Sequence, residues 1–348
     1  MSRSFTERRV VLVGGAGFVG HHLALHLKNA GAHVHVIDDF AHNNFEIRRA
    51  FSLSQPADEG HRSILRERLE LLDAANIPLH KLDASDSRAL SAVLADIEPS
   101  VLVHLAGISS AELTEISPRS ALDCGLKSLV NCLEFSDHSL DRFVYFSSSM
   151  VYGNFQGAEA DELHPATPIN VYGAMKLVGE RLVQACGRKS DLPFVIVRPS
   201  ALYGPRCVNR RIVQRLLTQA IHNIPLTIAG DGSELLDFTY VTDLIDGICL
   251  AIERPEAIQQ VFNITFGMGR TLLELVDVIR NYFPAMTATY CEQDRNKPHR
   301  GTLSIRKAMD LLGYMPAFDL ERGIPAYLEW MQPGVTRQAY SRRRAAGL

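Results

Sequence analysis

A tyrosine and a lysine four positions apart are the first candidates for chemistry. The stretch NVYGAMK places Tyr172 and Lys176 on one face of a predicted helix, because residues at i and i+4 lie above each other in an α-helix. A tyrosine acts as a base near neutral pH only if its pKa falls well below about 10, and adjacent positive charge lowers it. Such a pair alone is usually an ordinary exposed one, so the segment upstream must support it.

Three serines lie upstream of this helix. The segment FSSSMVYG ends a predicted buried strand with Ser147, Ser148 and Ser149. A hydroxyl at that strand end can hydrogen-bond a substrate oxygen and the oxygen of an ionised tyrosine. The residue types alone leave open which of the three serines does so. Together the two segments favour proton transfer by Tyr172.

A glycine motif predicts a dinucleotide site. VGGAGFVG places Gly14, Gly17 and Gly20 directly after a predicted strand and at the start of a helix. Glycines there permit a tight turn, close approach of backbone to a pyrophosphate, and close packing of the helix on the strand. The next predicted strand ends at Asp38, where a carboxylate can accept hydrogen bonds from a ribose diol and repels a 2′-phosphate. The motif therefore predicts NAD as the cofactor rather than NADP.

These motifs need elements that position them. Apolar runs alternate with helical patterns through the first half of the chain, which predicts parallel strands joined by crossover helices. The runs are nearly continuous and rich in β-branched residues, as in strands covered on both faces. The expected fold is α/β, with a doubly wound parallel Rossmann sheet. We predict strands at 10–13, 33–37, 77–83, 101–105, 143–146 and 194–197, and helices at 19–30, 87–97, 118–135 and 170–186.

The second half of the chain lacks this alternation. Turn signals at YGPR and AGDGS separate helices predicted at 211–222 and 272–282, which suits a smaller, mostly C-terminal α/β substrate-binding domain. The charged segment 41–76 is interpreted as an insertion with one or two surface helices and no assigned chemistry. We assign 1–198 and about 238–262 to the NAD-binding Rossmann domain, about 199–237 and 263–332 to the substrate-binding domain, and 333–348 to a tail.

Composition excludes several classes of function. The 348 residues are 46% apolar and 22% charged, as in ordinary soluble globular proteins, and a net charge of −3 argues against a nucleic-acid-binding protein. The one basic cluster, Arg342 to Arg344, lies in the tail. The six cysteines lack metal-ligand spacing, so we expect reduced thiols and no metal. No apolar run reaches signal-peptide or membrane-span length, so we expect a cytoplasmic protein with no membrane partner.

Taken in order, the glycine motif, the acidic strand end, SSSMVYG, YGAMK and RPSALYGP resemble the extended short-chain dehydrogenase/reductase family of NAD-dependent sugar-nucleotide epimerases and dehydratases, such as UDP-glucose and UDP-glucuronate 4-epimerases. The resemblance runs from Val10 to about Gly323. It implies Ser148, Tyr172 and Lys176 as catalytic residues, and a homodimer formed through helices 118–135 and 170–186. The cofactor-binding residues that it implies are Gly14, Gly17, Phe18, Val19, Gly20, Asp38, Asp39, Asp83, Ala106, Gly107, Tyr172, Lys176 and Pro199.

Two residues next to Ser148 bear on the reaction. Members of the family pass a hydride from a sugar carbon to NAD+, which leaves a transient ketone. Dehydratases and decarboxylases resemble this chain but carry acidic groups where it has Ser149 and Met150, neither of which transfers a proton usefully. This favours epimerisation at C4 of a sugar nucleotide, in which the ketone turns over and the hydride returns. The alternatives are another reaction of the family, an epimerase of an atypical, non-nucleotide sugar, and a catalytically silent NAD-binding sensor or scaffold.

The chain departs from the family on the substrate side. Relatives usually carry an Asn and an Arg that contact the substrate pyrophosphate where this chain has Ala201 and Leu236, and commonly an Asn where it has Cys124. Either other cations replace them, or the substrate is unusual. The available cations are Arg206, Arg210, Arg211 and Arg300. The implied substrate-binding residues are Ser148, Ser149, Tyr172, Ala201, Arg206, Leu236 and Arg300.

Overall fold

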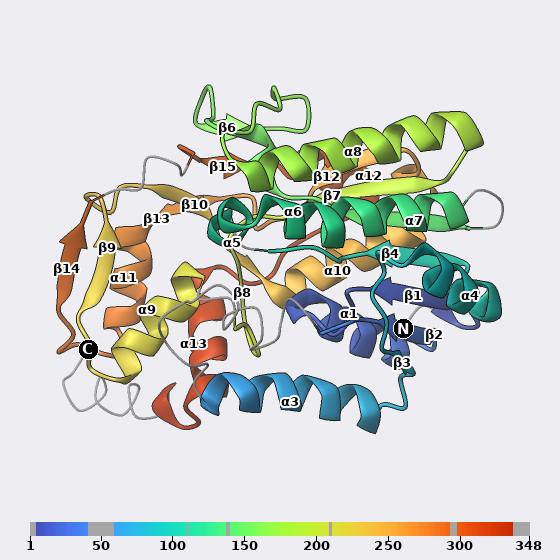
Figure 1. The fold of residues 1–348 in the computed structure, drawn as a ribbon. Helices are drawn as coiled ribbons and strands as arrows, with labels where there is room; N and C mark the ends of the chain where they lie inside the picture. The colour runs from blue at the N-terminus through green and yellow to red at the C-terminus, as the bar shows by residue number, and fades with distance from the viewer. Residues whose placement is uncertain are drawn as a thin grey trace.

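A seven-stranded parallel sheet forms the centre of the computed structural model, which describes residues 5–40, 59–109, 111–136, 140–208, 211–292 and 298–336 (Figure 1). The strand order is β12-β7-β5-β4-β1-β2-β3, so the chain adds β2 and β3 on one side of β1 and the later strands, beginning with β4, on its other side. Ligands bind such sheets at the carboxyl ends of the strands on either side of this switch point. The fold is therefore the predicted Rossmann fold. Its strands are β1 (Arg9–Val13), β2 (His33–Ile37), β3 (Leu79–His80), β4 (Val101–His104), β5 (Arg142–Phe146), β7 (Phe194–Arg198) and β12 (Gln260–Asn263).

Helices cover both faces of the sheet, because successive residues of a strand point to opposite sides. In β1, Val10 and Leu12 belong to one apolar cluster, and Val11 and Val13 belong to another. The first cluster includes α1 (Phe18–Asn29) and α10 (Val241–Glu253). The second includes α4 (Ser87–Ile97), α7 (Ser128–Phe135) and α8 (Val171–Ser190). Two-sided burial explains the continuous apolar runs of the sequence.

The helix predicted at 118–135 is not regular. It consists of α6 (Pro118–Ala121), a π-helical turn, η2 (Leu122–Lys127), and α7, and it follows the short α5 (Ala111–Ile116). The Ser128 hydroxyl donates to the backbone carbonyls of Cys124 and Gly125, satisfying acceptors of this widened turn. Single π turns are frequent at functional sites.

The rest of the chain forms short two-stranded sheets and helices beside the large sheet (Figure 1). The strand pairs are β6 (Glu159–Ala160) with β15 (Thr302–Leu303), β8 (Leu202–Tyr203) with β11 (Thr239–Tyr240), β9 (Leu226–Ala229) with β14 (Ala288–Cys291), and β10 (Leu235–Asp237) with β13 (Gly269–Thr271). The helices are α9 (Ile212–Ile221), α11 (Leu272–Arg280), α12 (Arg306–Leu312) and α13 (Leu320–Met331), with the single turns η3 (Ser149–Tyr152) and η4 (Pro255–Ala257). The domain boundaries stay a prediction, as does the substrate-binding role of this part.

The predicted insertion contains one helix within the described ranges, α3 (Glu59–Ala74), which packs beside α1 (Figure 1). It is more than a surface helix, because Arg68 and Leu72 are buried. The Arg68 Nε donates to the Arg206 carbonyl at 3.1 Å, so α3 holds the segment after β8. Residues 41–58 of the insertion lie outside the described residues, as does most of the predicted tail. None of the helices in the described ranges is long and apolar enough to cross a membrane.

Candidate functional site

A groove opens at the carboxyl ends of β1, β2 and β4, where the sheet order reverses. Its lining includes every predicted cofactor-binding residue except Pro199, whose carbonyl instead accepts the Ser149 amide at 2.9 Å. The lining residues that the sequence predicted are Gly14, Gly17, Phe18, Val19, Gly20, Asp38, Asp39, Asp83, Ala106, Gly107, Tyr172 and Lys176. Residues from five segments of the chain thus meet in one place.

The glycine motif makes the floor of this groove. Gly14 has φ +83°, and a Cβ there would lie 2.7 Å from the Ala106 nitrogen, so a side chain at this position would push the loop off β4. A Cβ on Gly20 would lie 2.6 Å from the Gly15 Cα, so glycine there lets α1 pack on the loop. Gly17 caps α1 with extended backbone and no side-chain hydrogen bond. The first N–H groups of α1 are left for an anion, which fits the pyrophosphate of a dinucleotide.

Asp38 lies where β2 ends and closes one end of the groove. Its Oδ2 accepts the Ala16 amide and its Oδ1 accepts the Phe40 amide, both at 2.9 Å. Each carboxylate oxygen has a further lone pair, so the side chain can still accept hydrogen bonds from a ribose diol. Burial raises the pKa of Asp38 to about 6, although both amides act to lower it. The side chain fits the predicted ribose contact.

Of the three predicted catalytic residues, Tyr172 and Lys176 line the groove, whereas Ser148 is buried beside Tyr172 and does not line it. Asn170 caps α8 by accepting the Gly173 amide at 2.9 Å, and this fixes the first turn, which carries Tyr172. A hydrogen bond joins Tyr172 to Ser148. Lys176, one turn further on, donates from Nζ to the Phe146 carbonyl at 2.6 Å. The end of β5 and the start of α8 therefore assemble Ser148, Tyr172 and Lys176.

Burial controls the charges of these groups. It raises the pKa of Tyr172, while the positive charge of Arg211 and the hydrogen bond with Ser148 act to lower it. Burial also lowers the pKa of Lys176 to about 8. The sequence predicted that the charge of Lys176 lowers the pKa of Tyr172. In the protein alone, the cation that lowers the pKa of Tyr172 is Arg211.

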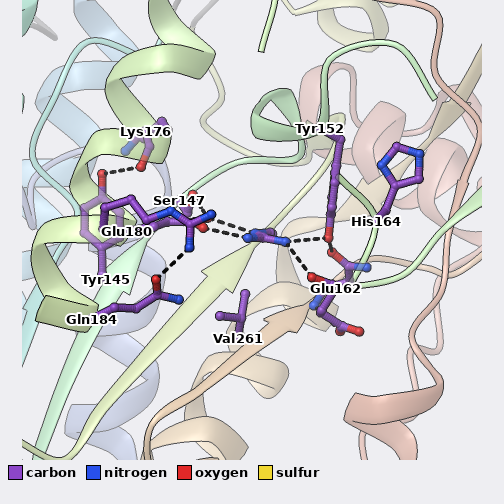
Figure 2. Close-up of polar contacts among 12 residues, drawn as sticks. Tyr145, Ser147, Tyr152, Glu162, His164, Lys176, Glu180, Gln184 and Val261 are labelled. Carbon is purple, nitrogen blue, oxygen red and sulfur yellow. Dashed lines mark hydrogen bonds and ion pairs between the residues drawn. The ribbon is translucent and has the colours of Figure 1, made fainter. Parts of the chain in front are cut away.

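Behind the catalytic residues lies a buried polar network, shown in Figure 2. Glu180 accepts the Ser147 hydroxyl through Oε1 and binds Arg198 through both oxygens, with an Nη2–Oε2 distance of 2.6 Å. Arg198 also donates from Nη1 to the Tyr152 hydroxyl at 3.0 Å, and Tyr152 donates to Asn263 at 2.7 Å. The network ties α8 to the carboxyl ends of β5, β7 and β12, and so supports the strand end that carries Ser148.

The π turn brings Cys124 and Ser128 to the groove lining. Burial raises the pKa of the Cys124 thiol to about 12, so it is neutral at physiological pH and unsuited to act as a base or a nucleophile. The Ser128 hydroxyl lies 2.9 Å from Nε2 of the buried His104. Burial lowers the pKa of His104 to about 3, which keeps this imidazole neutral.

The predicted substrate residues are not all in one place. Ser149 is buried in η3, and Ala201 is half-buried with φ +32°. Leu236 is 3% exposed and lies in the apolar core, where it pairs in register with Arg270 of β13. None of these three lines the groove. Their contact with substrate stays a prediction.

The candidate cations are also dispersed. Arg206 donates from Nε to Nε2 of His21 at 3.0 Å and forms an ion pair with Glu67 of α3. Arg300 lines a second hollow, where its Nη2 lies 3.4 Å from Glu234. Arg211 alone of the described candidates lines the groove with Tyr172. Arg210 lies outside the described residues.

Sequence reasoning missed Glu180 and did not place Arg211 in the groove. Glu180 could have been found, since it follows Lys176 by four residues on the same face of α8. Arg211 caps α9 and is far from Tyr172 in the chain, so no local spacing indicates that the two meet.

Comparisons with known proteins agree with this geometry. Residues 10–265 match the model of the family described as the NAD dependent epimerase/dehydratase family. YtcB of Bacillus subtilis (strain 168), described as an uncharacterized UDP-glucose epimerase, is 30% identical over 335 residues, covering 94% of this chain and 99% of the relative. UDP-glucuronic acid decarboxylase 4 of Arabidopsis thaliana is 27% identical over 91% of this chain and 67% of its own.

A solved structure is similar over almost the whole chain. UDP-glucuronic acid 4-epimerase from Bacillus cereus, in complex with UDP-glucuronic acid and NAD, superposes with a TM-score of 0.82 at 28% identity. The match covers 95% of this chain and 99% of that one.

Proposed function

Because this chain belongs to the NAD-dependent epimerase/dehydratase family, with NAD as its cofactor, we propose that it inverts carbon 4 of a UDP-linked sugar through a transient ketone. The observation that carries the proposal is that Tyr172 and Lys176 line the NAD groove while a hydrogen bond joins Ser148 to Tyr172. This assembly can remove a proton from a sugar hydroxyl and give it back.

The roles of the side chains follow from their positions. Ionised Tyr172 takes the proton of the C4 hydroxyl, and Ser148 donates a hydrogen bond to the same sugar oxygen. Lys176, anchored to the Phe146 carbonyl, keeps positive charge on the Tyr172 side of the groove. When bound, NAD would supply the acceptor and donor of the C4 hydride, and Tyr172 would hold the hydroxyl proton and give it back after inversion.

Positions 149 and 150 disfavour the other reactions of the family. Ser149 is buried with its amide bonded to the Pro199 carbonyl, and Met150 has no ionisable group. Expulsion of water needs an acid for the leaving hydroxyl, and neither residue supplies one. A catalytically silent NAD sensor would have no need for Ser148, Tyr172 and Lys176 together.

The proposal is tested by following C4 inversion by proton NMR with UDP-glucose, UDP-galactose and UDP-glucuronate, beside free and phosphorylated sugars. We expect inversion of a UDP-sugar without net consumption of NAD. Tyr172→Phe should lower kcat by about 10²- to 10⁴-fold, because it removes the proton acceptor. Tyr290→Phe, at an exposed tyrosine of β14, is the matched control and should retain parental kcat.

Three results would contradict the proposal. Build-up of NADH in proportion to substrate would indicate an oxidoreductase. Release of water or carbon dioxide would indicate a dehydratase or a decarboxylase. Unchanged turnover by Tyr172→Phe would show that the assembly described above is not the catalytic one.

A further inference from the structure

Arg211 stands out among the residues that line the NAD groove. Its Nε is buried and has no hydrogen-bond partner among the described residues. An unpaired guanidinium N–H away from water is costly, so such a group implies an acceptor that the protein does not supply. Arg300 also has an unpartnered Nε, but its guanidinium is paired with Glu234, and Arg206 is paired with Glu67.

Charge is distributed unevenly along the groove. The carboxylates of its lining are Asp38, Asp39 and Asp83, which follow β2 and β3. The cations of its lining, Lys176 and Arg211, lie at the opposite side, with α8 and the start of α9. No carboxylate among the described lining residues comes from that side, and Glu180, which acts on Lys176 from behind the groove, is itself bound to Arg198. The positive charge on that side of the groove therefore lacks a facing anion. An anionic group on the substrate would compensate it.

The position of Arg211 selects which substrate group this can be. Tyr172 receives the proton of the C4 hydroxyl in the proposed function, on which this inference rests. In a six-membered sugar ring C4 adjoins C3 and C5, whereas C1, which carries the pyrophosphate, is on the opposite side of the ring. Arg211 and Tyr172 line the same groove, and the positive charge of Arg211 acts on the Tyr172 hydroxyl. The hydrogen-bond acceptor of Arg211 is therefore a substituent on a carbon next to C4. In a hexuronate, the substituent on C5 is a carboxylate.

We propose that Arg211 binds the C6 carboxylate of a hexuronate, so that the substrate class is a UDP-hexuronate rather than a UDP-hexose. A guanidinium and a carboxylate form charge-assisted hydrogen bonds, which are about twice as strong as neutral ones. The hydroxymethyl group of a hexose offers the guanidinium only one uncharged oxygen at that place, so it can form neither an ion pair nor a bidentate contact. The loss of polar side chains at Ala201 and Leu236 leaves this uronate contact untouched, because neither residue lines the groove.

Measurements of substrate binding test this inference independently of catalysis. Titration calorimetry on NAD-loaded Tyr172→Phe, which binds without turnover, should give an affinity for UDP-glucuronate about tenfold or more above that for UDP-glucose. Adding Arg211→Gln should weaken UDP-glucuronate binding by about 10- to 100-fold and change UDP-glucose binding by less than about threefold. Retained UDP-glucose binding also shows that the variant has folded. Arg211→Lys should retain part of the preference.

Arg215→Gln is the matched control, since Arg215 lies one turn further along α9, is exposed, and does not line the groove. It should leave both affinities unchanged. In the active enzyme, Arg211→Gln also removes a charge that lowers the pKa of Tyr172, which affects both substrates alike. The ratio of kcat/KM for UDP-glucuronate over UDP-glucose cancels that shared effect and should fall by about 10- to 100-fold.

Equal losses for both substrates would overturn the inference, because they would place Arg211 on the pyrophosphate or assign it to Tyr172 alone. No loss for either substrate would overturn it as well. Failure of the chain to invert any UDP-sugar would instead contradict the proposed function, and the binding ratio could still be measured.

Discussion

Asp38 shows how one buried carboxyl group couples cofactor binding to pH. Its burial raises its pKa from 3.8 to about 6, so the folded protein holds a proton there that the unfolded chain releases. The stability that this proton contributes is present below pH 3.8 and is lost as the pH rises to about 6. A ribose diol donates hydrogen bonds, so it needs the ionised form.

We therefore expect NAD to bind about tenfold more tightly at pH 7 than at pH 5, because the competent ionised fraction of Asp38 rises by that factor. Asp38→Asn should bind NAD weakly and with a flat pH profile. Asp96→Asn, at an exposed position of α4, should keep the parental profile. Fluorescence titration with NAD at several pH values measures this. A parental profile in Asp38→Asn would mean that the ribose contact is misplaced.

At the scale of elements, α8 carries the chemistry and its own attachment on one face. Tyr172 and Lys176 face the groove, and Glu180, one turn further, is fully buried against Ser147 and Arg198. The Tyr145 hydroxyl of β5 adds a hydrogen bond to the Lys176 carbonyl at 3.4 Å (Figure 2). The buried ion pair therefore sets where α8 lies against the sheet.

Removing one partner of a buried ion pair leaves the other charge uncompensated, so Glu180→Gln should lower the free energy of unfolding by about 3 to 5 kcal/mol. The exposed pair Asp277–Arg280 on α11 is the control, and Asp277→Asn should change the free energy of unfolding by less than about 1 kcal/mol. Urea denaturation measures both. Equal, small losses would show that the Glu180 pair does not hold α8.

At the scale of the whole molecule, the surface around α8 suits the homodimer that the family resemblance implies. The helix lies beside α5, α6 and α7 (Figure 1). Large apolar side chains are exposed at Ile116 in α5, Leu122 in η2, Val130 in α7 and Val178 in α8 itself. Clustered exposed apolar residues mark association surfaces. We propose that two copies associate through this surface.

Val178→Arg should shift the protein from dimer to monomer, because it places an unpaired charge in the centre of an apolar contact. Sedimentation velocity measures the change. Ile224→Arg, at an exposed apolar residue after α9, should leave the parental state unchanged. A Val178→Arg protein that sediments like the parent would exclude this surface as the dimer contact.

The sequence by itself determined the Rossmann sheet, the NAD groove and the pair Tyr172 and Lys176. These depend on short-range regularities: the alternation of strand and helix, a glycine turn before a helix, and a four-residue helical spacing. The strands and most helices lie within a few residues of their predicted ends. The π turn at 122–127 was not predicted, because it depends on the Ser128 side chain bonding backbone within its own helix.

Only the tertiary structure decided which distant residues meet. Leu236 is in the core and Arg206 is paired with Glu67, although both belong to segments where the family resemblance implied substrate contacts. Arg211 lies in the groove with Tyr172, and Glu180 binds Arg198. Such pairs depend on how the helices pack on the sheet. No periodic pattern in the sequence predicts that packing. For this reason most residues that line the groove could be predicted from local patterns, while the positions of Arg211, Leu236 and Glu180 required the structure.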